Sequence, residues 1–123
     1  MGTRDDKLYS EEHIWIKIDE EYAYIGITDY LQDKLGDISF IDIAEEGTNL
    51  EIDDEFASIE ASKIATELIS PIGGQIYEIN SKLQKQPQNI NKNPEDTWII
   101  KVIDYSQLDN LYEWNEYKNI IKE

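Results

Sequence analysis

The chain has 123 residues, no cysteine and a formal net charge of −16 at pH 7. That length suits one domain with one hydrophobic core, and the missing thiols exclude both disulfides and thiol chemistry by the protein itself. Such an acidic surface repels nucleic-acid phosphates and anionic lipid, and no apolar run approaches the roughly 18 residues that span a bilayer. We therefore expect no nucleic-acid or membrane partner, and fast encounters with partners that present basic patches.

The chain is predicted to begin with two strands and a short helix. Residues 1–8 are polar and are expected to be frayed. Apolar and polar residues alternate over residues 14–18 and again over 22–27, a period of two that is typical of half-buried strands. A helix is expected over residues 28–35. Thr28 is a suitable N-terminal cap, and Gly36 suits the left-handed conformation that often follows the last turn of a helix.

A hairpin is predicted at the centre of the chain. Strands are expected over residues 38–43 and 48–52, separated by a glycine-containing turn. Two further runs, 56–61 and 65–69, are rich in small or β-branched residues and flank a tight link centred on Lys63. Paired as a hairpin, these runs would hold one lysine at a rigid tip, away from the core.

The rest of the chain adds two strands and a terminal helix. A strand over residues 75–79 follows a turn rich in proline and glycine, and residues 81–86 suit one or two helical turns. The stretch 87–96 is the longest predicted loop. Residues 98–103 are almost continuously apolar, so this strand is expected to be buried on both faces. A C-terminal helix is expected from about Glu113. Many short strands with few helices predict a sandwich or flattened barrel.

Five segments carry recognisable motifs, namely residues 9–15 (YSEEHIW), 26–38 (GITDYLQDKLGDI), 60–64 (EASKI), 70–80 (SPIGGQIYEIN) and 98–101 (WIIK). In order and in approximate spacing they resemble the motifs of the glycine cleavage system H protein family. The second is similar to that family's Gly-Ile-Thr-Asp-x-Ala-Gln-x-x-Leu-Gly-Asp-Ile signature, and the third resembles its lipoylation motif, Glu-Ser-x-Lys-Ala. The segments are distributed from residue 9 to residue 101, so the resemblance extends along most of the chain.

The resemblance implies a carrier and not an enzyme. Members of that family bear lipoate on a lysine, and this arm shuttles the aminomethyl group of glycine between the glycine decarboxylase and the aminomethyltransferase. A dihydrolipoamide dehydrogenase reoxidises the dithiol, and a lipoate ligase or lipoyl transferase attaches the cofactor. The implied fold is a mainly β, flattened barrel-sandwich hybrid (lipoyl-domain-like) with a short internal helix and a C-terminal helix. We expect a single lipoyl-carrier domain over residues 9–123, monomeric, in the bacterial cytoplasm or the mitochondrial matrix.

By its position in the motif, Lys63 is the residue to which the resemblance assigns lipoate. Acylation needs an exposed amine without a lasting ion pair, which a hairpin tip provides. Glu60, Ser62 and Glu67 flank this lysine, and we expect them to serve in recognition by the modifying enzyme or in orientation of the cationic arm, solubility being the alternative for the two carboxylates. His13 is the only histidine, so it can organise no metal cluster. It is expected to pack on the first strand, although the resemblance implies a groove there for the loaded arm.

Several positions depart from the family pattern. Ile14 replaces a glutamate, and Ala61 and Ile64 replace a serine and an alanine beside the modified lysine. If the usual glutamate holds the cationic arm, Ile14 weakens or relocates the resting pocket, and Ile14→Glu would hold the arm better. These departures leave open a lipoyl relay that donates lipoate to, or serves, another enzyme complex. A biotinyl carrier is disfavoured because Ser62 and Ile64 stand where such domains present methionines.

Overall fold

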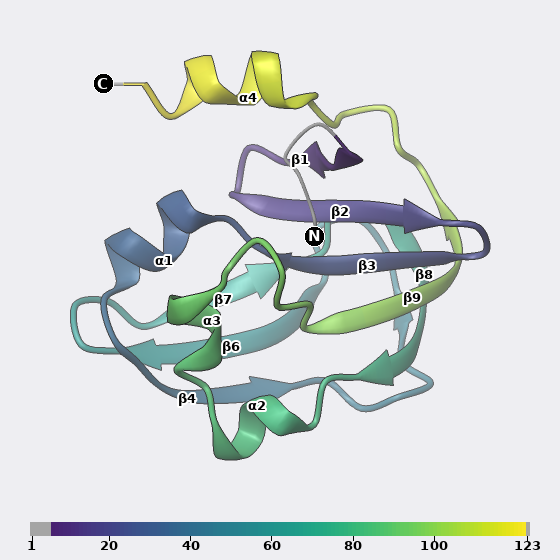
Figure 1. Ribbon diagram of the computed structural model, residues 1–123. Helices are drawn as coiled ribbons and strands as arrows, with labels where there is room; N and C mark the ends of the chain where they lie inside the picture. Colours follow the sequence, from purple (N-terminus) through teal and green to yellow (C-terminus); the bar gives the residue numbers. More distant parts are fainter. Residues whose placement is uncertain (1–5, 123) are drawn as a thin grey trace.

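Figure 1 shows the computed structural model of the protein, which describes residues 6–122. In the first half of the chain the elements are, in order, β1 (Leu8–Tyr9), β2 (Ile14–Asp19), β3 (Tyr22–Ile27), α1 (Asp29–Leu35), β4 (Ile38–Ile43), β5 (Asn49–Leu50) and β6 (Glu55–Ala61). In the second half they are β7 (Thr66–Ile69), β8 (Gly73–Ile79), α2 (Lys82–Lys85), α3 (Asn89–Lys92), β9 (Ile100–Ser106) and α4 (Trp114–Ile120).

The strands form two antiparallel sheets. The larger sheet has the order β1-β2-β3-β9-β8-β5, and the smaller has the order β4-β6-β7. The main hydrophobic cluster takes residues from both sheets, among them Ile16 and Ile25 of the larger sheet and Ile41 and Ile59 of the smaller. The core therefore lies between the sheets (Figure 1), and the mainly β architecture predicted from the sequence is confirmed.

The N-terminal strand begins inside the segment that the sequence predicts to be frayed. Residues 1–5 of that segment lie outside the described part of the chain. Leu8, however, pairs with Ile16 at the edge of the larger sheet, and Lys7 is 3% exposed. The cause is the C-terminal segment, because Tyr9 and Tyr112 exchange two backbone hydrogen bonds of 2.8 Å and so cover this short strand from its open side.

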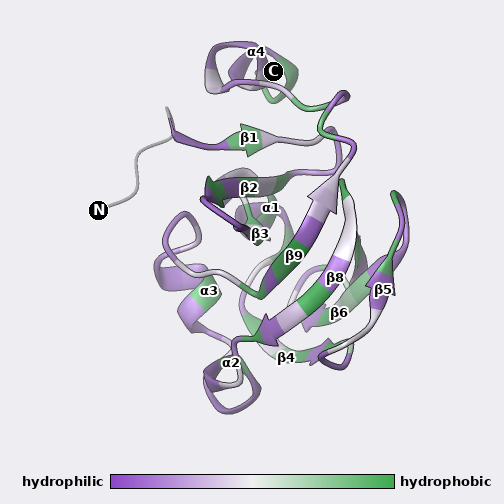
Figure 2. Cartoon of the chain, turned by 90° about the vertical axis from the view of Figure 1, so that its right-hand side faces the viewer, coloured by the Kyte–Doolittle hydropathy of each residue, from purple (hydrophilic) through white to green (hydrophobic). Residues whose placement is uncertain are grey.

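The expectation that the last strand is buried on both faces is wrong. β9 begins at Ile100 and alternates in burial, with Ile100 and Val102 buried and Lys101 half-exposed between them. In Figure 2 this strand carries both hydrophobic and hydrophilic residues. Nζ of Lys101 lies 5.0 Å from the ring centroid of Tyr22 and 5.1 Å from that of Tyr24. It also forms an ion pair with Glu78 of β8. The outer face of β9 therefore carries a lysine covered by aromatic rings of β3, and only the inner face of the strand is buried in the core.

The predicted helices are confirmed at both ends of the fold. The hydroxyl of Thr28 accepts a hydrogen bond from the backbone N–H of Leu31 (3.2 Å), which caps α1, and Gly36 follows the helix with a φ of +85°. At the other end, Glu113 caps α4 through a reciprocal capping box with Glu116. Among the described residues, no helix is long and apolar enough to cross a membrane.

Candidate functional site

The link between β6 and β7 presents Lys63 to solvent. The two strands pair with Ser58 opposite Glu67 and Ile59 opposite Thr66, which confirms the predicted hairpin. The Lys63 side chain is exposed. In Figure 1 this link lies at one end of the smaller sheet, beside α1. The hairpin therefore places one amine at the edge of the molecule, where a modifying enzyme can reach it.

The hairpin does not hold this turn alone, because the end of α1 binds it from the side. The N–H of Lys63 donates to the carbonyl of Leu35 (2.9 Å), and the N–H of Ser62 donates to that of Asp37 (2.9 Å). The hydroxyl of Ser62 also accepts a hydrogen bond from the N–H of Asp37 (3.0 Å). The backbone at Lys63 is thus fixed while its side chain remains exposed, which is the geometry that a tethered arm needs at its base.

Gly36 allows the segment between α1 and β4 to approach the turn. Its φ of +85° lies in the left-handed region, which glycine adopts without a steric penalty. A Cβ atom at this position would overlap the hydroxyl of Ser62 and would lie 3.0 Å from Cγ of Lys63. We call the residues from Leu35 to Asp37 the α1–β4 corner, and its close contact with Lys63 requires a glycine at its centre.

Asn91 of α3 holds the opposite side of the α1–β4 corner. Its Oδ1 accepts from the N–H of Ile38 (2.9 Å), and its Nδ2 donates to Oε1 of Gln32 (2.8 Å) and to the carbonyl of Gly36 (2.9 Å). One half-buried side chain therefore joins α3 to α1 and to β4, which meet beside Lys63. Asn91 was not predicted as a site residue, because it stands in the stretch 87–96 that was predicted to be a loop, part of which forms α3.

A hollow of about 390 Å³ opens at the foot of the lysine side chain. It is lined by Gln32, Asp33, Gly36, Asp37, Ser62, Lys63 and Asn91. Within it, Nζ of Lys63 donates to the backbone carbonyl of Asp33 over 3.3 Å, a length at which a hydrogen bond is weak. The amine can therefore leave this contact at little cost, and the polar lining tolerates both a charged and an acylated lysine.

The predicted flanking residues have different surroundings. Ser62 makes the backbone contacts described above, so it anchors the turn. Glu60 and Glu67 are exposed side chains of β6 and β7. Glu60 lies opposite Phe40 of β4 and Glu67 lies opposite Ser58. The two carboxylates therefore lie on the outer face of the smaller sheet, where a partner can contact them.

His13 belongs to a different part of the molecule. Its Nδ1 lies 2.7 Å from the hydroxyl of Tyr117, which lies 3.0 Å from the hydroxyl of Thr28. The His13 ring also contacts Tyr30 at 4.7 Å between ring centroids. Burial lowers the pKa of His13 below its ordinary value. Among the described residues, His13 is not part of the lining of the hollow at Lys63, and its contacts connect α4 to the start of α1.

Ile14 is fully buried in the core between the sheets. It lies opposite Ile27 of β3, and its exposed fraction is 0%. Its backbone exchanges hydrogen bonds with Ser10, since Ile14 N–H donates to the serine hydroxyl and the serine N–H donates to the Ile14 carbonyl. A side chain in this position contacts the core instead of a surface groove, so an arm contact at residue 14 has no support in this fold.

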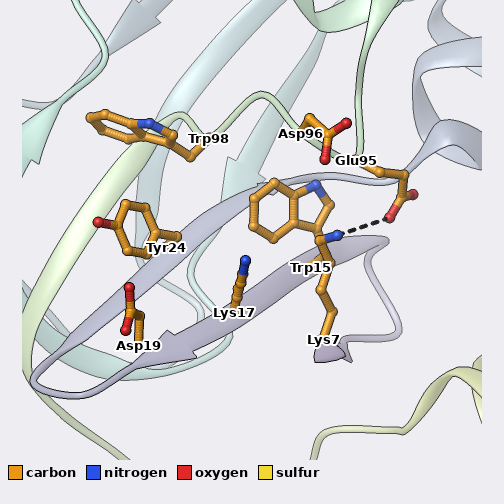
Figure 3. Close-up of a pocket in the computed structure, with 8 residues that line it drawn as sticks. All are labelled: Lys7, Trp15, Lys17, Asp19, Tyr24, Glu95, Asp96 and Trp98. Atoms are coloured by element: carbon orange, nitrogen blue, oxygen red, sulfur yellow. Dashed lines mark ion pairs between the residues drawn. The ribbon is translucent and has the colours of Figure 1, made fainter. Parts of the chain in front are cut away.

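A second cavity, of about 280 Å³, lies on the outer face of the larger sheet (Figure 3). Its lining comprises Lys7, Trp15, Lys17, Asp19, Tyr24, Glu95, Asp96 and Trp98. Its groups are used in packing, because Trp15 Nε1 donates to the carbonyl of Pro94 (2.9 Å) and Lys7 lies 4.0 Å from Glu95. The Trp15 contact fastens the loop before β9 to β2, and the ion pair joins that loop to the residue before β1. Lys63 does not line this cavity.

Comparison with known proteins agrees with the order of the motifs. A family model described as glycine cleavage H-protein matches residues 7–123. A protein named glycine cleavage system H protein from Geobacillus sp. (strain WCH70) is 38% identical over 126 residues, covering 100% of this chain and 99% of that protein. One of the same name from Clostridioides difficile (strain 630) is 43% identical over 113 residues, covering 89% of this chain and 90% of that protein.

Solved structures agree as well. The crystal structure of a glycine cleavage system H protein from Mycobacterium marinum matches this fold with a TM-score of 0.87 at 27% sequence identity. The match covers 94% of this chain and 95% of the other. The likeness therefore extends over most of the fold.

Proposed function

Because the chain belongs to the glycine cleavage H-protein family, we propose that Lys63 is the residue that carries its lipoyl group. One observation supports this assignment most directly: the Lys63 side chain is exposed while its backbone is bound to the α1–β4 corner. The surrounding residues fit a lipoyl-lysine, since the hollow is polar and open and the hydrogen bond from the amine to the carbonyl of Asp33 is long.

The chain is a non-catalytic lipoyl carrier of the glycine cleavage system, and it works with the decarboxylase and the aminomethyltransferase of that system. The lipoyl group, when attached, supplies the dithiol, since the chain has no cysteine. The protein itself holds the base of the arm and presents a fixed surface around it. The hydrogen bonds of Ser62 and Lys63 to the α1–β4 corner perform the first of these tasks.

Attachment of the cofactor requires little chemistry from this chain. The deprotonated amine of Lys63 attacks an activated lipoyl carbonyl, an amide bond forms, and the bond between that carbonyl and its activating group breaks. The proton of the amine leaves to solvent. The reaction removes the positive charge of the lysine, so the net charge falls by one from −16.

Two further partners belong to this proposal. A lipoate ligase or lipoyl transferase would load Lys63, and a dihydrolipoamide dehydrogenase would reoxidise the arm. The exposed carboxylates of Glu60 and Glu67 would meet basic side chains of such partners. We place the protein in the cytoplasm as a monomer, a location supported by its bacterial relatives.

Intact-mass spectrometry tests the attachment site. Co-expression with a lipoate ligase and lipoate is expected to add one lipoyl group, and Lys63→Arg is expected to abolish the adduct completely. Lys34→Arg is the matched control, because Lys34 is an exposed lysine in the last turn of α1. A full adduct on the Lys63→Arg protein would overturn the assignment. Incubation of the loaded protein with glycine and the decarboxylase is then expected to give the aminomethyl form, whereas a lipoyl relay would stay unmodified.

A further inference from the structure

The outer face of the smaller sheet carries an exposed aromatic ring near the Lys63 turn. Phe40 lies opposite Glu60 in the pairing of β4 with β6, and cross-strand neighbours of this kind point to the same side of a sheet. The adjacent pair, Ile41 and Ile59, is buried in the core. Phe40 therefore points to solvent, and 50% of its surface is exposed.

Three carboxylates share this face with Phe40. Glu60 lies opposite Phe40 itself, while Asp42 and Glu67 lie on either side of Ser58 in the next row across the three strands. All three carboxylates are exposed. A protein that covers this face must therefore offer an apolar slot for one ring and basic side chains around it.

The short reach of an unmodified lysine indicates which partner must contact the surface around it. A lysine amine extends only about 6 Å from its Cα, whereas a lipoyl-lysine extends about 14 Å. The enzyme that acylates Lys63 must therefore bring its active site to the protein surface. Glu60, with Phe40 opposite it, lies about 10 Å along the chain from Lys63 at the strand rise of 3.3 Å. A standard interface of roughly 800 Å² per partner has a radius of about 16 Å, so it covers Phe40.

We propose that Phe40 is the apolar anchor by which the enzyme that acylates Lys63 docks on this protein, with the adjacent carboxylates meeting basic side chains of that enzyme. Ile64, beside the lysine and also 50% exposed, extends the apolar contact to the turn. This inference rests on the proposed role of Lys63. In this proposal the acylating enzyme recognises the outer face of β4 and β6, whereas the α1–β4 corner holds the base of the arm.

Lipoylation kinetics with a purified lipoate ligase test the anchor, with the adduct measured by intact mass. Phe40→Ser is expected to raise the KM for the protein substrate at least tenfold with kcat nearly unchanged, since truncation of an aromatic anchor in an interface has an effect of this size. Phe40→Tyr, which keeps the ring, is expected to stay within about twofold of the original protein. Tyr77→Ser is the matched control, because Tyr77 is 51% exposed on β8 of the larger sheet.

A competition experiment separates docking from acylation. The Lys63→Arg protein cannot be acylated at this position, so it is expected to inhibit lipoylation of the original protein competitively. Adding Phe40→Ser to it is expected to weaken this inhibition at least tenfold. Equal effects of Phe40→Ser and Tyr77→Ser, in either assay, would overturn the anchor while leaving Lys63 as the attachment site. An adduct that persists in Lys63→Arg would instead overturn the proposed function.

Discussion

Replacing Asn91 with alanine tests whether α3 supports the corner that holds Lys63. The change removes one hydrogen bond to Ile38 N–H and two to oxygen atoms of Gln32 and Gly36, all between 2.8 and 2.9 Å. Each bond contributes about 1 kcal/mol, and an N–H left without a partner in a half-buried site adds to the loss. We therefore expect the free energy of unfolding to fall by about 3–4 kcal/mol, which corresponds to a decrease in Tm of roughly 15 °C for a domain of this size.

Urea unfolding measures the loss, and hydrogen exchange locates it. The amide of Lys63, which is bonded to the Leu35 carbonyl, is expected to exchange faster in Asn91→Ala by more than the global loss of stability explains. Asn91→Asp is expected to be at least as destabilising, because it brings a carboxylate against the carbonyl of Gly36. Asn89→Ala is the control, since Asn89 also belongs to α3 but its side chain donates to Oε1 of Gln86 and not to the α1–β4 corner.

A loss below about 0.5 kcal/mol for Asn91→Ala, or unchanged exchange at the amide of Lys63, would refute this reasoning. The first result would show that the three hydrogen bonds are replaced by water without cost. The second would show that the corner keeps its position without α3, so that the hairpin and α1 alone determine the base of the arm.

Two further substitutions test the corner and the core. Gly36→Ala is expected to lower the Tm more than Gly47→Ala. Both residues have positive φ angles, but of the two only a Cβ at Gly36 would overlap Ser62. Equal decreases in Tm would contradict the close contact between Gly36 and Ser62. Ile14→Glu is expected to lower the free energy of unfolding in urea by about 2–4 kcal/mol, against about 1 kcal/mol for Ile14→Val, because it buries a carboxylate. An Ile14→Glu protein as stable as Ile14→Val would restore residue 14 as a possible arm contact.

The hairpin, α1 and α4 could be predicted because their signals are local. An alternating run on each side of Lys63 predicts the hairpin, and a threonine cap followed by a glycine marks both ends of α1. The order of the strands could not be predicted in this way. β9 lies between β3 and β8 in the larger sheet, and such pairings between distant segments leave no pattern within either strand.

The residues of the site also differ in whether their signals are local or depend on distant segments. Lys63 was found from its own motif, but its support comes from Asp37, which is 25 positions away from Ser62, and from Asn91, which is 53 positions away from Ile38. Likewise, the contact that fixes His13 joins it to a residue 104 positions away. The lysine that we propose as the attachment site lies in a local motif, whereas the residues that position it are brought together only by the complete fold.

Fixing the backbone at Lys63 affects recognition by the acylating enzyme more than it affects the local concentration of the reactive end of a lipoyl arm. An arm with a reach of about 14 Å sweeps a half-sphere of about 5,700 Å³, which corresponds to a concentration near 0.3 M for its reactive end. If the base moved by a further 5 Å, the swept volume would rise to about 14,000 Å³ and the concentration would fall only two- to threefold. Docking is more sensitive, because a displaced turn would no longer present Lys63 at a constant distance from Phe40. The corner and Asn91 therefore act mainly by keeping the lysine and its surrounding surface in one arrangement, which the acylating enzyme can recognise as a unit.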